Sequence, residues 1–480
     1  MKLSFIVPPC FDHKQAAERS AGCTRVVYPA PNIYELQVAA YLESDIRDTV
    51  SYHDFAFYGK SRADFEAFAA SDQSDVYLFW TVNLSISTDL EAISIIRKTR
   101  PDVPVILMGP GPTHFLDKCL PDSRVFIARG EPELTVKAIV DTLRKGGDFG
   151  EVDGLSYRNA EGRVVNNRPR PLIKDLDALP FAARHLLGDA EYHNPKLKTA
   201  PYATMITSRN CPFKCIYCVP SSLSFAREIE FRREHGRKPT IGFRSPENVE
   251  KEIAMLAEQG VKAIGFMDDN FIWNEERTAA ICDIMKRYNM VWGCEARVDA
   301  ITEPIAKMLG ESNCRYIDLG IESFDDAILA YIKKGIKSED IYRAIGLLKK
   351  YGVPVKLNVL IGSSPLETRE TVLHTLREAK KLDVDQVMFN IVSPFPATEY
   401  YKICKENGWI KTDDYVPTDV QRQSILNLPN LSADEMERLL FRNNVSFFLS
   451  WRFIRKQLWR FRSPKELIAA AKALKIKLFG

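Results

Sequence analysis

The sequence predicts an α/β protein in which a doubly wound parallel sheet is followed by a partial (β/α)6 barrel and a helical C-terminal region. Two patterns indicate this class: continuous apolar runs alternate with amphipathic segments over residues 1–148, and six further strand–helix repeats occupy residues 199–400. Such runs are typical of parallel strands that helices cover on both faces. The composition agrees, because 45% hydrophobic and 27% charged residues exclude wholesale disorder, a collagen-like fibre and a small disulfide scaffold.

Residues 1–148 are predicted to form the first sheet. Its candidate strands are Leu3–Val7, Thr49–Phe57, Asp75–Val82, Val103–Met108 and Val125–Ala128, and its candidate helices include Ser87–Lys98 and Glu133–Arg144. Open sheets of this kind bind ligands beyond the carboxyl ends of their strands. Those ends carry Pro8-Pro9, Thr81-Val82-Asn83 and Gly109-Pro110-Gly111.

Residues 149–198 are predicted to be a linker that contains a β-hairpin over residues 154–167, with Glu161-Gly162 at its turn. Residues 199–400 are predicted to form the barrel, and residues 401–480 to be mostly helical. The candidate barrel strands are Ala203–Ser208, Ala263–Asp268, Val291–Arg297, Tyr316–Glu322, Val355–Ile361 and Gln386–Val392. The candidate helices include Pro246–Gln259, Glu275–Arg287, Glu303–Gly310, Ser338–Tyr351 and Glu367–Leu382. Barrel chemistry takes place at the carboxyl ends of the strands, and these ends are polar here.

Three of the ten cysteines are crowded into eight residues after the first barrel strand: Cys211, Cys215 and Cys218. A structural zinc site uses four ligands, whereas three thiolates suit a [4Fe–4S] cluster with one iron left open for a small molecule. The alternatives are a chance cluster of core cysteines and a zinc site completed by a residue elsewhere. The spacing and the strand–helix context favour the iron–sulfur cluster.

This CxxxCxxC segment resembles the hallmark of the radical S-adenosylmethionine (radical SAM) superfamily. The resemblance implies that the three cysteines ligate the cluster, that the open iron binds the methionyl part of SAM, and that Tyr217 packs on the adenine. It further implies that an electron from the cluster cleaves SAM and that the resulting 5′-deoxyadenosyl radical removes hydrogen from an unactivated carbon. The cofactor carries this chemistry, while the protein orients the substrate and excludes water.

Other strand ends carry further candidates for the SAM site, again through the resemblance. These are Asp268, Asp269, Glu295, Arg297, Glu322 and Ser323. Asp268 and Asp269 correspond to the contact with the SAM amino group, Arg297 to a partner of the SAM carboxylate, and Glu322-Ser323 to the ribose region. Each has a structural alternative: a helix N-cap, a salt bridge at the barrel rim, or a buried structural carboxylate.

The first domain resembles the Rossmann-like cobalamin-binding domain of B12-type radical SAM enzymes, through DVYLFWTV, GPGPTH and RGEPE. The resemblance makes cobalamin a further cofactor, and its candidate contacts are Thr81, Asn83, Ser85, Gly109, Gly111 and Glu131. The alternative is that these are ordinary loop ends of a flavodoxin-like sheet. None of the seven histidines stands in a D-x-H-x-x-G motif, so no lower-axial histidine is predicted.

The C-terminal segment differs in charge from the rest of the chain. Residues 441–480 contain ten Lys or Arg and one acidic residue, a net charge of +9 that leaves −6 for residues 1–440. Aromatic and basic residues interleave over 447–462, as in a helix lying on an anionic bilayer surface. The alternative is an amphipathic helix packed on the barrel. No uncharged apolar run reaches the ~18 residues that span a bilayer. We therefore expect a cytoplasmic protein, peripheral at the inner face of the membrane, with no nucleic-acid partner.

The resembling branch includes magnesium-protoporphyrin ester cyclases and hopanoid-modifying enzymes. It implies modification of an unactivated carbon in a hydrophobic substrate (a lipid, isoprenoid or tetrapyrrole), with flavodoxin or ferredoxin as electron donor. C-methylation is the favoured reaction, and a cyclase or ring-rearranging enzyme is the alternative. Methylthio transfer is disfavoured because Cys10, Cys23 and Cys119 lack the spacing of a second cluster. A non-enzymatic iron–sulfur redox or scaffold protein is the alternative of another class.

Overall fold

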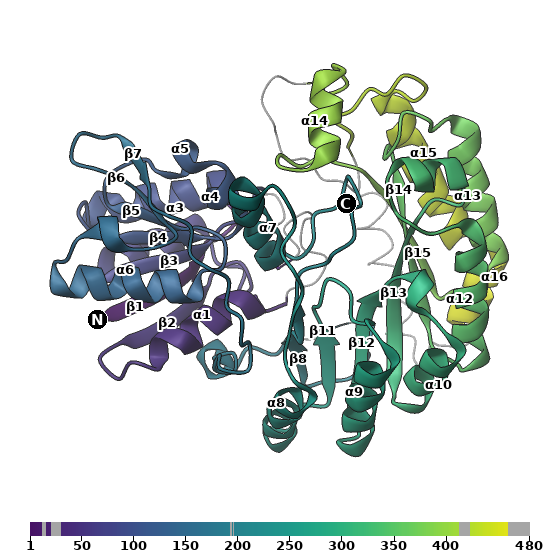
Figure 1. Ribbon diagram of the computed structural model, residues 1–480, viewed down its shortest axis with the longest axis horizontal. Helices are drawn as coiled ribbons and strands as arrows, with labels where there is room; N and C mark the ends of the chain where they lie inside the picture. The colour runs from purple at the N-terminus through teal and green to yellow at the C-terminus, as the bar shows by residue number, and fades with distance from the viewer. Residues whose placement is uncertain (12–15, 21–29, 193, 195, 412–422, 459–480) are drawn as a thin grey trace. The chain divides into compact units, whose positions relative to one another are not determined.

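The computed structural model describes residues 1–11, 16–20, 30–192, 194, 196–411 and 423–458 (Figure 1). The chain forms two compact units. The first contains residues 1–212 and 219–269, and the second contains residues 213–218 and 270–480.

The first unit is built on a seven-stranded sheet in the order β2-β1-β3-β4-β5-β6-β7. Its strands are β1 (Lys2–Val7), β2 (Thr49–Asp54), β3 (Val76–Trp80), β4 (Val105–Met108), β5 (Val125–Ala128), β6 (Leu155–Arg158) and β7 (Val164–Asn166). Strands β1 to β5 are parallel, and the predicted hairpin adds β6 and β7 as antiparallel strands. The order 2-1-3-4-5 is that of flavodoxin-type sheets, in which ligands bind at the switch point between β1 and β3.

Helices cover both faces of this sheet, as predicted for continuous apolar strands. One apolar core joins it to α1 (Ile33–Glu43) and α6 (Glu133–Lys145). The other joins it to α2 (Arg62–Ser71), α3 (Ile86–Thr99) and α5 (Leu116–Cys119). The same unit contains α4 (Pro110–His114), β8 (Tyr202–Met205), β9 (Ser208–Arg209), α7 (Ser222–His235), β10 (Gly242–Phe243), α8 (Pro246–Glu258) and β11 (Ala263–Phe266).

The helices of this unit that have no counterpart among the predicted elements include α1 and α7. Helix α1 is buried along nearly its whole length, including Glu35 and Gln37. The first nine residues of α7 are buried as well, and they include Arg227, Glu228 and Glu230. A helix buried all round, with polar residues inside, lacks the one-sided apolar stripe on which the prediction of a helix depends.

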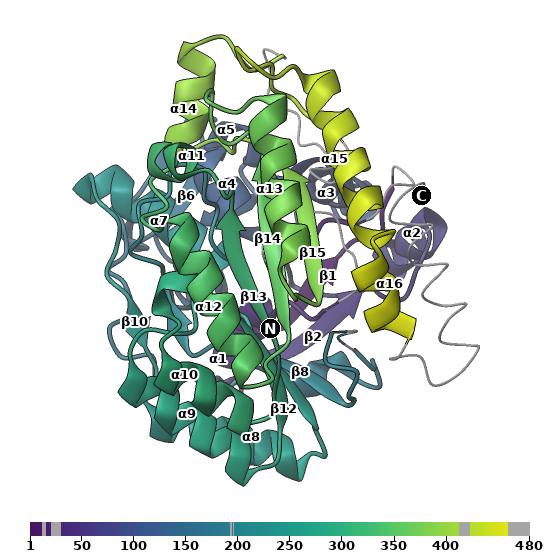
Figure 2. The ribbon, with the colours of Figure 1, turned by 90° about the vertical axis from the view of Figure 1, so that its right-hand side faces the viewer.

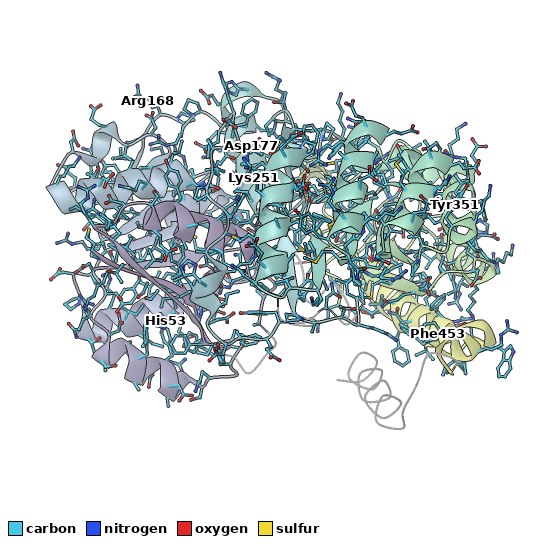
Figure 3. All side chains as sticks on the ribbon, turned by 90° about the horizontal axis from the view of Figure 1, so that it is seen from below. His53, Arg168, Asp177, Lys251, Tyr351 and Phe453 are labelled. Atoms are coloured by element: carbon cyan, nitrogen blue, oxygen red, sulfur yellow. The ribbon has the colours of Figure 1, made fainter. Side chains whose placement is uncertain are left out.

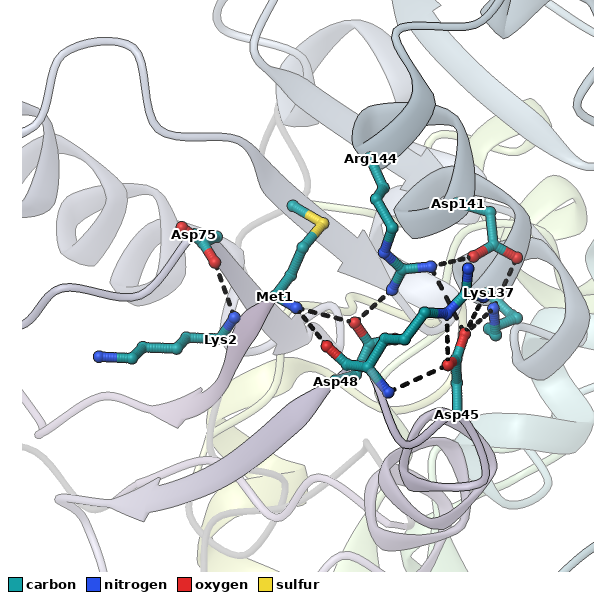
Figure 4. Close-up of polar contacts among 9 residues, drawn as sticks. Met1, Lys2, Asp45, Asp48, Asp75, Lys137, Asp141 and Arg144 are labelled. Carbon is teal, nitrogen blue, oxygen red and sulfur yellow. Dashed lines mark hydrogen bonds and ion pairs between the residues drawn. The ribbon is translucent and has the colours of Figure 1, made fainter.

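Charged groups form a network of ion pairs at the amino-terminal edge of the sheet, where β1 begins (Figure 4). The ammonium group of Met1 donates to the carbonyl of Arg47 at 2.7 Å and to Asp48 at 3.1 Å. Arg144 of α6 also pairs with Asp48, and Lys137 pairs with Asp141 at 2.6 Å. The carboxyl ends of the strands lie at the opposite edge, so this network leaves the ligand-binding edge unobstructed.

The second unit contains four parallel strands that pair in chain order: β12 (Val291–Ala296), β13 (Cys314–Glu322), β14 (Val355–Ile361) and β15 (Gln386–Ile391). Its helices are α9 (Glu275–Arg287), α10 (Glu303–Glu311), α11 (Asp326–Tyr331), α12 (Ser338–Lys350), α13 (Arg369–Lys381), α14 (Glu399–Glu406), α15 (Ala433–Phe448) and α16 (Trp451–Leu458). Helices α13 and α15 lie over one face of β14 and β15 (Figure 2). With β8 and β11 of the first unit, these strands are the six parallel strands predicted for the barrel.

The described part of the C-terminal segment is helical, as predicted. Phe453 of α16, labelled in Figure 3, packs against Phe447 and Phe448 of α15 with ring centroids 5.5 and 5.1 Å apart. Leu449, just after α15, and Trp451, the first residue of α16, are 61% and 73% exposed. The predicted interleaving of aromatic and basic residues continues over 459–462, which lie outside the described residues. Within the described residues, no helix has the length and apolar character needed to span a bilayer.

Candidate cofactor site

The cysteine loop, residues 211–218, follows β9 and its three cysteines are accessible to a ligand. Cys211, Cys215 and Cys218 are each half-buried and none forms a disulfide. The middle of the loop is fixed by backbone hydrogen bonds, because Ile216 donates to the Ile332 carbonyl at 3.1 Å and accepts from Tyr400 at 3.0 Å. No three His, Cys, Asp or Glu side chains of the described residues are already gathered around a metal position. The donor set of three thiols in one anchored loop fits an iron–sulfur cluster.

The trailing side of the loop is anchored by a charged pair in the second unit. Lys334 donates to Glu322 at 2.7 Å and to the hydroxyl of Tyr217 at 3.3 Å. Both charged side chains are buried, at 8% and 7% exposure. Burial would lower the pKa of Lys334, but Glu322 and the Cys215 thiol outweigh it and raise that pKa. Burial and Glu322 likewise raise the pKa of Tyr217 well above its ordinary value, so its phenol stays protonated.

The leading side of the loop is anchored by a larger ion cluster in the first unit. Arg209 of β9, two residues before the first cysteine, donates to Glu131 at 2.5 Å, to Glu133 at 2.7 Å and to Gln37 at 2.8 Å. Arg227 of α7 forms an ion pair with Glu131 at 3.2 Å. Burial would lower the pKa of Arg209, but the two carboxylates raise it. The guanidinium is therefore a fixed positive charge beside the loop.

The two aspartates predicted for the SAM amino group follow β11, and both accept hydrogen bonds. Asp268 accepts from the backbone of Thr207 at 3.1 Å, from its hydroxyl at 2.8 Å and from Ser208 at 2.5 Å. Asp269 accepts from the backbone of Ser221 at 2.7 Å. Burial raises the pKa of Asp269. These carboxylates therefore join the segments on both sides of the cysteine loop.

The remaining SAM candidates lie on or after β12 and β13. Glu295 is an exposed residue within β12. Arg297 forms a two-pronged pair with Asp299, at 2.9 Å for each bond, and its guanidinium lies 3.7 Å from the ring centroid of Phe213 in the cysteine loop. Ser323 accepts from the backbone of Asp325 at 3.1 Å. The structure thus gives Arg297 and Ser323 partners of their own, while Arg297 still contacts the loop.

The first sheet presents buried polar atoms with no partner at the switch point. Thr81 and Asn83 follow β3 and are 1% and 5% exposed. Among the residues that the structure describes, the Thr81 hydroxyl and both polar atoms of the Asn83 amide have no hydrogen-bond partner. Because an unpaired buried polar group costs roughly 1–3 kcal/mol, such a group commonly has a bound ligand or water as its partner. These two residues fit the contact with cobalamin that the sequence predicts.

The other residues predicted to contact cobalamin have partners or packing roles. Ser85 donates to Asp89 at 2.8 Å. Gly109 has φ of +100°, and a Cβ atom there would lie 2.7 Å from the Thr81 carbonyl. A Cβ atom at Gly111 would lie 3.1 Å from the same carbonyl. Both glycines are thus required by the close packing of the two loops after β3 and β4.

Three thiols in one loop at the start of a strand–helix series, with buried charges on both sides, are a donor set that fits an iron–sulfur protein. The family model of the radical SAM superfamily matches residues 205–379. The uncharacterized methyltransferase PH0819 of Pyrococcus horikoshii is 32% identical over 388 residues, which cover 79% of this chain and 80% of that protein. The chain therefore belongs to the radical SAM superfamily, as the sequence predicted.

Two further similarities concern particular relatives. The anaerobic magnesium-protoporphyrin IX monomethyl ester cyclase of Synechocystis is 26% identical over 327 residues, covering 66% of this chain and 61% of that protein. The radical SAM methyltransferase TsrM of Kitasatospora setae, solved with cobalamin and a [4Fe–4S] cluster, superposes with a TM-score of 0.61 at 17% identity, covering 91% of this chain and 80% of that one. At this identity the likeness is one of fold, and it confirms the predicted fold class.

Membership of the superfamily makes the protein a radical SAM enzyme with a [4Fe–4S] cluster and SAM as cofactors. Such an enzyme acts on a small-molecule substrate and takes its electron from an external reductant. The predicted alternative of a non-enzymatic scaffold is thereby set aside. The cations that hold the loop were missed by sequence reasoning, and these are Arg209, Arg227 and Lys334.

Proposed function

We propose that the protein is a cobalamin-dependent radical SAM enzyme that methylates an unactivated carbon. The observation that carries the proposal is the pair Thr81 and Asn83 at the switch point of the first sheet, whose buried polar atoms have no partner within the described part of the chain. Two similarities support it. The 32% identical relative is named a methyltransferase, and the superposable TsrM structure, also a methyltransferase, contains cobalamin.

The residues of this chain have separable roles in the proposed reaction. Cys211, Cys215 and Cys218 hold the cluster, and Thr81 and Asn83 bind the corrin or its side chains. When bound, the cluster and SAM supply hydrogen abstraction from carbon, and cobalamin supplies the methyl group. The protein itself binds and orients these groups and keeps water from them.

The test uses the cost of the unpaired hydroxyl at Thr81. A Thr81→Val variant removes that hydroxyl while keeping the side-chain shape, so it should stabilise the cobalamin-free protein by about 1 kcal/mol and weaken cobalamin binding. Thr204→Val is the matched control, because the Thr204 hydroxyl on β8 is also buried and has no partner in the described ranges of the chain. Stability is measured by urea unfolding and affinity by equilibrium dialysis of hydroxocobalamin. Equal cobalamin affinity in both variants and the wild type would reject the proposed site.

Anaerobic turnover tests the reaction type. With reductant, SAM and substrate, methyl transfer through cobalamin releases S-adenosylhomocysteine together with 5′-deoxyadenosine. Formation of 5′-deoxyadenosine alone would favour the cyclase or ring-rearranging reaction, which the 26% identical cyclase relative supports. Flavodoxin or ferredoxin is the proposed electron donor.

The proposed substrate is hydrophobic (a lipid, isoprenoid or tetrapyrrole), taken up at the cytoplasmic face of the membrane through residues 441–480. Support comes from the exposed apolar side chains of Phe441, Leu449 and Trp451 beside the net charge of +9 in this segment. Aromatic and basic residues together bind anionic bilayer surfaces.

Liposome co-sedimentation tests this membrane contact. Truncation after Asn443 and the substitution Trp451→Ser should both weaken binding to vesicles that contain anionic lipid. Ile46→Ser is the matched control, because Ile46 is 98% exposed but lies in the first unit. Unchanged binding after truncation would assign the segment to packing within the protein.

A further inference from the structure

The two residues that precede the first cysteine are fixed more firmly than a loop requires. Arg209 is 2% exposed and is bonded to Glu131, which lies between β5 and α6, and to Glu133, the first residue of α6. Asn210, directly before Cys211, has φ of +79°, in the left-handed region that few residues other than glycine adopt. Its backbone N–H donates to Ser224 at 2.9 Å.

Helix α7, which follows the loop, completes this arrangement in the same unit. Arg227 of α7 donates to the side-chain carbonyl of Asn210 and pairs with Glu131 at 3.2 Å. Ser222, on the first turn of α7, accepts from the indole of Trp80 at 3.0 Å. Arg209 and Asn210 are thus held from two directions, by the first sheet and by the helix that leaves the loop.

The charges in this cluster balance. Arg209 and Arg227 face Glu131 and Glu133, and Arg209, Glu131 and Glu133 are at most 6% exposed. Breaking a buried pair by removing one partner leaves an uncompensated charge and is strongly destabilising, whereas a hydrophobic core of the same volume would serve stability as well. We therefore interpret this cluster of charges as a device that orients the backbone of β9, and not as a source of stability. The fork of Arg209 imposes one geometry on β9 because it bonds several acceptors at once.

We propose that Glu131, Glu133 and Arg209 are positioning residues for the iron–sulfur cluster, which they serve by fixing Cys211 at the start of the loop. The RGEPE segment of the first sheet then acts on the cysteine loop and not on a corrin. Both carboxylate oxygens of Glu131 are engaged in the protein, one by Arg209 and the other by the backbone of Ile173 at 2.6 Å. This inference goes beyond the proposed function, because it holds for any substrate and with or without cobalamin.

The test compares Arg209→Lys, Glu133→Gln and Glu131→Gln with the control Glu230→Gln in the full-length protein. Glu230 is a buried carboxylate of the same unit that pairs with Arg129 at 2.8 Å but makes no bond to β9. Each variant is reconstituted anaerobically with iron and sulfide. Two properties are then measured: the rate at which a chelator removes iron, and the electron paramagnetic resonance spectrum of the reduced cluster before and after SAM is added.

We expect the three test variants to release iron about 10-fold faster or more, the range for residues that orient metal ligands. Their spectra should be heterogeneous and respond less to SAM, while Glu230→Gln matches the wild type. Arg209→Lys keeps the charge, so its failure would show that the fork geometry is needed. If the test variants lose thermal stability as Glu230→Gln does, with iron release and spectra unchanged, the cluster of charges is structural only and the proposal is overturned.

Two further outcomes keep the inference separate from the proposed function. If Arg209→Lys does not fold, Glu133→Gln is the variant that tests the proposal. It keeps the shape of the side chain and leaves Arg209 its bonds to Glu131 and Gln37. Equilibrium dialysis of hydroxocobalamin is run on Glu131→Gln. Lost cobalamin binding with normal iron release would overturn the assignment of Glu131 and return it to a corrin contact. Lost cobalamin binding in Thr81→Val leaves the inference untouched.

Discussion

The two sides of the cysteine loop are held by buried charges of different design. On the leading side, Arg209 bonds two carboxylates at the start of α6 and an amide of α1. On the trailing side, Lys334 meets a single carboxylate, Glu322, and the hydroxyl of Tyr217. A guanidinium fork with several acceptors fixes direction, whereas a single ammonium acts as a compact point charge.

This difference indicates what each side contributes. The leading side fixes the path of the backbone into Cys211, since Asn210 next to Arg209 is also held in a left-handed conformation. On the trailing side, Glu322 and Tyr217 both accept a hydrogen bond from Lys334. Both of these residues are predicted to contact SAM. We therefore expect changes on the leading side to affect cluster retention, and changes on the trailing side to affect SAM binding.

Removing one of the three cysteine ligands should have the largest effect on cluster content and activity. The charged groups on either side of the loop position the cysteines but cannot replace a missing ligand. Cys215→Ala should abolish the cluster and the activity while the fold persists, since Cys215 is only half-buried. Iron and sulfide assays with circular dichroism test this. Full cluster content in this variant would contradict the assignment of the three ligands.

Breaking the buried ion pair between Lys334 and Glu322 on the trailing side should have the second-largest effect. Lys334→Met leaves the Glu322 carboxylate buried without its cation, which costs about 3–5 kcal/mol. Adding Glu322→Gln removes the stranded charge and should recover much of that loss. Urea unfolding measures the stabilities, and SAM binding to the reconstituted protein is measured in parallel. Unchanged stability and unchanged SAM binding in Lys334→Met would contradict the role assigned to the trailing side of the loop.

A buried carboxylate without a dedicated cation sharpens the comparison, and its effect is a dependence of stability on pH. Glu35 of α1 is fully buried and accepts from Tyr52 at 3.2 Å, and its other oxygen has no partner among the described residues. The nearby cation Arg19 is engaged by Asp89 at 2.7 Å. Burial therefore raises the pKa of Glu35 to about 8, from 4.5.

The sign of the resulting pH dependence follows from proton binding. Between pH 4.5 and about 8 the folded chain keeps a proton on Glu35 that the unfolded chain releases. The free energy of unfolding contributed by this group therefore falls as pH rises, by about 1.4 kcal/mol per pH unit. Glu35→Gln should remove this slope and be more stable than the wild type at pH 8. Glu161→Gln, at an exposed carboxylate of the hairpin, is the control. Identical slopes in the wild type and Glu35→Gln would contradict the raised pKa.

Much of the fold could be predicted from the sequence, because buried parallel strands leave a direct trace as continuous apolar runs. Strands β5 and β14 match their predicted limits residue for residue. The limits of β2 were predicted three residues too long, to Phe57, because Phe55 and Phe57 are apolar but follow the end of the strand. Helices α1 and α7 left no such trace, since their buried faces include charged residues.

The candidate site divides in a similar way. Residues inside a short motif, such as the three cysteines and Tyr217, could be recognised because their spacing is local. Arg209 and Lys334 could not, because each is paired with a carboxylate that the chain places nearby only on folding. The one local signal was that Glu131 and Glu322 both stand in recognisable segments and, once buried, require a cation.

The most direct test of the account is one anaerobic sample of the full-length protein, produced with cobalamin available. Its ultraviolet–visible spectrum is recorded, and iron, sulfide and cobalt are assayed. The account predicts about four iron atoms per chain, as in a [4Fe–4S] cluster, with stoichiometric cobalt. Iron without cobalt would contradict the proposed methyl transfer and favour cyclisation. Absence of iron after reconstitution would contradict the assignment of the cysteine loop itself.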